Sequence, residues 1–131
     1  MFIRFVLQIR HPDTGVEEGI FRTAYDFRRA HSIAVHERQV LNEALEWLGK
    51  HLPVPTRFNR TKSKGYYRRE TKGVSWFKPT ARDHIARMRL LVTILEENGR
   101  TVNQIITRRP GYIVYEDEHQ VVAEPFFEKR G

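Results

Sequence analysis

The chain has 131 residues, no cysteine and a formal net charge of +7, and 40% of its residues are hydrophobic. This length and composition fit a single domain over residues 1–131. The lack of cysteine excludes disulfides, thiolate zinc sites and a cysteine nucleophile, and it favours a reducing compartment. No stretch approaches the roughly 20 apolar residues that span a bilayer, and the N-terminus lacks a signal-peptide pattern, so we expect a cytoplasmic protein without a membrane partner.

The first third of the chain predicts a strand and then a helix. Residues 2–10 alternate between apolar and polar side chains, a period of two that is typical of a half-buried strand. Its apolar face comprises Ile3, Phe5, Leu7 and Ile9. Thr14 and Glu17 have the spacing of a capping box, so we expect a helix to begin there and to run to about Ala30.

A second helix is predicted over residues 33–51, with Ser32 as its cap. Its apolar stripe comprises Leu41, Ala44, Leu45, Leu48 and Leu52. Pro53 and Pro55 end the helix, because proline cannot continue one. A single unbroken helix over residues 16–51 is the alternative interpretation of this region.

Residues 53–79 show no helical period, and we interpret them as a long loop or hairpin inserted into the domain. A short hairpin with residues 66–68 on one side and residues 74–77 on the other is one form of this insertion. Residues 57–78 hold eight Lys or Arg and a single acid, Glu70. The chain has 23 basic and 16 acidic residues in all, so its remainder has 15 of each and is neutral. The charge excess is therefore confined to one segment.

The last third of the chain predicts a helix and three strands. The helix has Thr80 as its cap and Asp83 in its first turn, and it ends at Gly99. The strands are expected at residues 102–107, 112–116 and 120–124. The Pro-Gly pair within residues 109–112 suits the centre of a type II turn.

In chain order these elements predict an α+β fold with the pattern β-α-α-loop-α-β-β-β. The expected architecture is a small antiparallel sheet of about four strands with three helices packed on one face. The basic segment lies outside this framework as an insertion.

The basic segment is the strongest candidate for a functional site. Lys and Arg neutralise phosphates and aromatic rings stack on bases, so a mixture of the two favours a nucleic-acid partner. The predicted phosphate contacts are Arg57, Arg60, Lys62, Lys64, Arg68, Arg69, Lys72 and Lys78. Tyr66 and Tyr67 lie between cations and are predicted to stack on bases, whereas Trp76 and Phe77 are expected to pack in the core. Exposed aromatic rings favour single-stranded RNA or DNA over duplex.

Two other interpretations rest on different features. The protein could be an interaction module that docks on an acidic protein or associates with itself through a sheet edge. A small nuclease would need clustered carboxylates or an acid–base pair. The candidates are Glu116, Asp117, Glu118 and Glu124, or one of His84 and His11 with Asp83 or Asp13. Because acidic residues are common in hairpin turns, we interpret residues 116–118 as a turn.

The sequence contains no motif for catalysis or for a cofactor. The six histidines have no metal-binding spacing, and neither a glycine-rich phosphate loop nor a serine nucleophile elbow is present. We therefore expect a non-catalytic nucleic-acid-binding protein with no cofactor and no metal. The oligomeric state and the choice between RNA and DNA stay open at this level.

Overall fold

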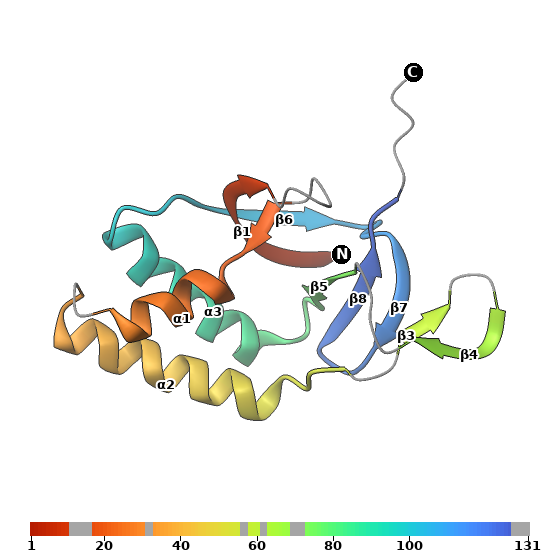
Figure 1. The fold of residues 1–131 in the computed structure, drawn as a ribbon, viewed down its shortest axis with the longest axis horizontal. Helices are drawn as coiled ribbons and strands as arrows, with labels where there is room; N and C mark the ends of the chain where they lie inside the picture. The colour runs from red at the N-terminus through yellow and green to blue at the C-terminus, as the bar shows by residue number, and fades with distance from the viewer. Residues whose placement is uncertain (11–16, 31–32, 56–57, 61–62, 69–72, 127–131) are drawn as a thin grey trace, which may run out of the picture.

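The computed structural model describes residues 1–10, 17–30, 33–55, 58–60, 63–68 and 73–126 (Figure 1). The elements in this part of the chain are β1 (Phe2–Arg10), β2 (Glu17–Gly19), α1 (Phe21–Arg29), α2 (Val35–His51), β3 (Phe58–Arg60), β4 (Ser63–Arg68), β5 (Val74–Phe77), α3 (Arg82–Glu97), β6 (Val102–Thr107), β7 (Tyr112–Glu116) and β8 (Gln120–Glu124). The α+β class is confirmed.

The described strands form a six-stranded antiparallel sheet and a separate two-stranded one. In the larger sheet the order is β2-β1-β5-β8-β7, and β6 lies on the other side of β1. Strand β6 pairs with residues 2–7 of β1. On the opposite edge of β1, β5 pairs with Ile3 through Phe77, and β2 pairs with Val6 through Gly19. The sheet is larger than the predicted one because β2 and β5 join it.

The helices α1, α2 and α3 gather on one face of the larger sheet (Figure 1). Their apolar stripes meet the inward residues of the sheet in one core. Its buried members include Phe5, Leu7, Ile20, Leu41, Leu45, Leu48, Phe77, Leu91 and Leu95. Each buried leucine stabilises the fold by about 1.5–3 kcal/mol relative to an exposed one, so this layer holds the helices on the sheet.

The opposite face of the central strands is also apolar. Trp76, Val121 and Ala123 form a second buried cluster there, and Phe2, Val74 and Ile105 pack against it. On β1 itself Val6 is fully buried, and only 9% of Arg4 is exposed. The prediction that β1 is half-buried is therefore wrong, because β1 lies in the middle of the sheet and packs on both faces.

The predicted first helix is shorter than expected. Glu17 lies in strand β2 rather than in a helix, and α1 begins only at Phe21. Thr14 lies outside the described residues. The reason is a free edge on β1, where Val6 and Arg10 pair with Gly19 and Glu17. The pairing of these strands is a tertiary contact, and a capping pattern within a few residues of sequence cannot predict it.

The other two helices lie where the sequence places them, but their caps differ. Helix α2 ends at His51 as predicted, and its N-cap is Ala34 because it begins two residues later than expected. Ser32 lies outside the described residues. The N-cap of α3 is Ala81 rather than Thr80, and no side chain caps it. At the other end Gly99 has φ of +88°, the conformation that ends helices at glycine.

The three C-terminal strands match the predicted ranges. Gly111 between them has φ of +135°, and the chain there forms a bend rather than a hydrogen-bonded type II turn. The predicted hairpin in the basic segment is wrong in its pairing. Strand β4 pairs with β3, whereas β5 joins the larger sheet beside β8.

Candidate nucleic-acid interface

Strands β3 and β4 form a small hairpin, which we call the arm. It projects past the edge strand β7, on the side of the sheet away from α1 (Figure 1). In its backbone register Phe58 is opposite Arg68, Asn59 is opposite Tyr67 and Arg60 is opposite Ser63. The arm thus gathers about half of the predicted contact residues on one hairpin: Arg60, Lys64, Tyr66, Tyr67 and Arg68. Arg57, Lys62, Arg69 and Lys72 lie outside the described residues.

The chain on both sides of the arm is anchored to the folded body. Before the arm, the Pro53 carbonyl accepts a hydrogen bond of 2.8 Å from the Gln120 side chain. The His51 carbonyl lies 2.7 Å from Nε2 of His84, so this nitrogen is the donor. After the arm, β5 pairs with β8 from Val74 to Phe77. A projecting segment on a rigid base is a common arrangement for binding sites.

Lys78 is separated from the other predicted contacts. It follows β5, and its ammonium lies 2.5 Å from Glu116 Oε2 at the edge of the sheet. A carboxylate therefore compensates its charge, and Lys78 is not part of the arm. Trp76 and Phe77, expected in the core, are 7% and 6% exposed and pack on opposite faces of the sheet.

An aromatic cluster that the sequence does not indicate lies where α2, α3 and the β7–β8 turn meet. Trp47 stacks on His51 with ring centroids 4.2 Å apart, and its edge meets His84 at 4.9 Å. His84 also packs on His119 at 4.3 Å. The guanidinium of Arg87 lies 4.4 Å from the centre of the Trp47 ring. These residues come from α2, α3 and the β7–β8 turn, so sequence spacing alone could not have indicated the cluster.

Arg87 gives this cluster a positive charge. Helix α3 carries two further arginines, Arg82 and Arg89. Arg82 and Arg89 are exposed on α3, and Arg87 is held over Trp47. His51 stacks on the Trp47 ring and the Arg87 guanidinium lies over it, so a base would have to compete with these groups to stack there.

The acidic run at residues 116–118 has a structural role in the β7–β8 turn. Asp117 Oδ1 accepts hydrogen bonds from the backbone N–H groups of His119 and Gln120, at 2.8 and 3.0 Å. Its Oδ2 accepts from Tyr115 Oη at 2.9 Å and from Gln120 Nε2 at 3.1 Å. Burial opposes ionisation of this carboxyl, but the hydrogen bonds outweigh burial and lower the pKa of Asp117. Burial, followed by the bond to Asp117 and its charge, raises the pKa of Tyr115.

The other predicted chemical groups do not come together in the described residues. Asp83 is exposed in the first turn of α3, whereas His84 is buried and bonded to the end of α2. His11 and Asp13 lie outside the described residues. No group of three His, Cys, Asp or Glu residues that could hold a metal ion occurs in the part of the chain that the structure covers. The Asp117 carboxylate in the turn already accepts hydrogen bonds from four donors.

Comparisons with protein-family models, with curated proteins and with solved structures find no match to this chain. None of the helices in the described ranges has the length and apolar character needed to cross a bilayer. Function is therefore inferred from the arm and its surroundings.

Proposed function

We propose that the protein binds nucleic acid through the arm, without catalysis, and that single strands are its better ligands. The observation that carries this proposal is the place of the charge excess. Within the segment that holds it, Arg60, Lys64 and Arg68 lie on a hairpin outside the six-stranded sheet, while the rest of the chain is neutral. Cations on such a hairpin can follow a phosphate backbone without the cost of burial.

The tyrosines of the arm give the proposal its preference for single strands. Tyr66 and Tyr67 lie in β4 between Lys64 and Arg68. Stacking on an exposed ring stabilises binding by about 1–3 kcal/mol per base, and duplexes do not offer unstacked bases.

The contribution of phosphate contacts can be tested by titrating labelled oligonucleotides at several salt concentrations and following their anisotropy. For single strands, log K falls with log salt by about 0.7 for each phosphate contact. The double variant Arg60→Ala/Arg68→Ala should weaken binding and lower this slope by about 1.4. Arg22→Ala/Arg29→Ala on α1 is the matched control. Both residues are exposed and distant in sequence from the arm, and their substitution removes the same two positive charges.

The contribution of stacking is tested separately with Tyr66→Leu/Tyr67→Leu. This variant should weaken binding to single strands by about tenfold or more, and the salt slope should stay unchanged. A duplex of the same sequence should show a smaller loss. Equal binding by the arginine arm variant, its control and the unmodified protein would contradict the proposal.

An interaction module is the second candidate, and the edge strand β6 favours it. Among the described strands, β6 has a partner only on the β1 side, and none of its six residues is charged. Arg100 precedes this edge, and Arg108 and Arg109 follow it. Such an edge suits an extended acidic segment added as a strand. A lack of oligonucleotide binding, together with binding of an acidic peptide that shifts the amides of β6, would favour this candidate.

A further inference from the structure

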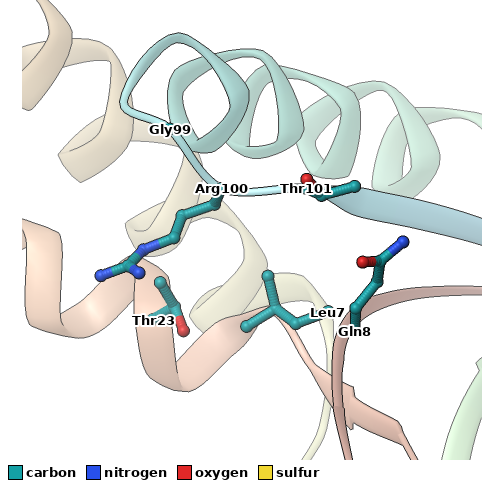
Figure 2. A pocket seen from close by; sticks show the side chains of 6 residues that line it. All are labelled: Leu7, Gln8, Thr23, Gly99, Arg100 and Thr101. Carbon is teal, nitrogen blue, oxygen red and sulfur yellow. The ribbon is translucent and has the colours of Figure 1, made fainter.

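A pocket of about 290 Å³ lies at the end of the β1–β6 ladder, far from the arm in the fold (Figures 1 and 2). Six described residues line it: Leu7, Gln8, Thr23, Gly99, Arg100 and Thr101. The pocket exists because pairing of β1 with β6 ends at Leu7 and Val102. Beyond this pair β1 continues to Gln8, while the chain before β6 turns away toward α3. Helix α1 closes the third side with Thr23.

The chemistry of the lining selects for an anion. Among the described residues around the pocket, Arg100 is the single charged one, and no carboxylate lines it. The hydroxyls of Thr23 and Thr101 and the amide of Gln8 can each donate a hydrogen bond. Figure 2 shows Leu7 between Thr23 and Gln8, with the Arg100 guanidinium beside Thr23 and with Thr101 on the same side as Gln8. Leu7 is 4% exposed, so the base of the pocket is apolar.

Arg100 is placed at the pocket by the end of α3. Gly99 has φ of +88°, which lets the chain reverse, and the Arg100 N–H then donates to the Leu95 carbonyl at 2.9 Å. The guanidinium lies 5.7 Å from the centre of the Phe27 ring on α1. In the described residues no carboxylate forms an ion pair with Arg100. The cation is thus held near the pocket, and none of the carboxylates that the structure describes compensates its charge.

We propose that this pocket binds the phosphate group of a small phosphate monoester. A phosphate has more acceptor oxygens than a carboxylate, and it matches a guanidinium together with three neutral donors. The volume is near the lower end of ligand pockets, which are roughly 300–1,000 Å³. It accommodates the phosphate and a small organic body against Leu7. The site is separate from the proposed function of the arm and does not depend on it.

Arg100 has a simpler role that the test must separate from ligand binding. The C-terminus of α3 carries partial negative charge, and an arginine there is favourable without any ligand. If this were its whole role, Arg100→Gln would lower stability and would leave phosphate binding unchanged. The negative helix end also means that a phosphate cannot bind here without the guanidinium.

The experiment is a titration of the ¹⁵N-labelled protein with inorganic phosphate and glycerol phosphate, at constant ionic strength set with chloride. Binding at the pocket should shift the amides of Gln8, Thr23, Gly99, Arg100 and Thr101 in a saturable manner. Arg100→Gln should weaken binding by about tenfold or more, and Thr23→Val should weaken it less. Arg89→Gln is the matched control, because Arg89 is exposed on α3, loses the same charge and does not line the pocket.

Two further arms separate the sources of the phosphate. A 5′-phosphorylated oligonucleotide that shifts the pocket amides, when its 5′-hydroxyl counterpart does not, would assign the site to a nucleic-acid end. Shifts with glycerol phosphate alone would assign it to a small molecule, as proposed. An absence of shifts at these amides, or equal phosphate affinity in Arg100→Gln and the unmodified protein, would overturn the proposal.

Discussion

The larger sheet with its helices and the arm differ in what their residues contact. In the sheet, β1 is buried on both faces, and the Lys78 ammonium is paired with Glu116. The arm is a two-stranded hairpin outside that sheet, and it belongs to the segment that holds the net charge of the chain. The arm lies outside the core of the larger sheet, where an unpaired charge would cost far more than one in water. The two regions should therefore respond differently to substitution.

The largest expected effect on stability is at Gly111, in the bend before β7. Its φ is +135°, and a Cβ there would overlap the backbone carbonyl of Glu124. Gly111→Ala should lower the free energy of unfolding by roughly 2–4 kcal/mol, as measured by urea denaturation. Gly49→Ala in α2 is the control, since a Cβ added at Gly49 would have no neighbouring atom within 4 Å. That change should stabilise the helix by about 0.5–1 kcal/mol, and equal effects at both glycines would contradict the prediction.

The next largest effect is expected at Asp117, which accepts bonds from four donors. Asp117→Asn should cost about 1–3 kcal/mol, because an amide cannot accept at both of its ends. The pKa of Asp117 is lowered in the folded protein. Its contribution is therefore complete above the ordinary aspartate pKa, and it is lost as the pH falls through the lower folded value. Unfolding measured across the acidic range should show a smaller acid-side decline in Asp117→Asn than in the unmodified protein.

A smaller effect is expected at the ion pair between Lys78 and Glu116, whose side chains are 23% and 52% exposed. Lys78→Met should change the free energy of unfolding by at most about 1 kcal/mol, since partly exposed pairs contribute little. It should also weaken oligonucleotide binding less than Arg68→Ala does, because the charge of Lys78 is compensated. A loss of affinity equal to that of Arg68→Ala would place Lys78 in the contact surface.

The smallest effect on stability is expected when residues 58–68 are replaced by a Gly-Ser segment of the same length. The free energy of unfolding should fall by only about 0.5 kcal/mol, because the arm meets the larger sheet chiefly where β3 lies near β7, while oligonucleotide binding should be lost. Thermal unfolding and anisotropy on the same preparation check both expectations. A large loss of stability would show that the arm is part of the folded unit, and the contrast between the two regions would then fail.

Much of the fold could be predicted from local patterns. The ranges of β6, β7 and β8 follow from short alternating runs with turn residues between them. Helix α3 follows from its apolar spacing and from Gly99. What local patterns missed are strand β2 and the pairing of β5, both of which need a distant partner. Strand β2 depends on a free edge of β1, and β5 depends on the register with β8.

The candidate sites divide in the same way. The composition of residues 57–78 identifies the basic and aromatic segment without a structure, because charge and aromaticity are properties of each residue. The aromatic cluster at Trp47 and the pocket at Arg100 could not be predicted, since their members come from three separate elements each.

The sequence by itself determined where the helices and most strands form and that the positive charge lies in one segment, because periodicity and charge are local. Only the tertiary structure decided that β1 is central, that β3 pairs with β4, and that Lys78 meets Glu116. It also decided which residues line the pocket beside Arg100. These features depend on which distant segments pack together, and that packing is set by the burial of the whole chain rather than by any one stretch of it.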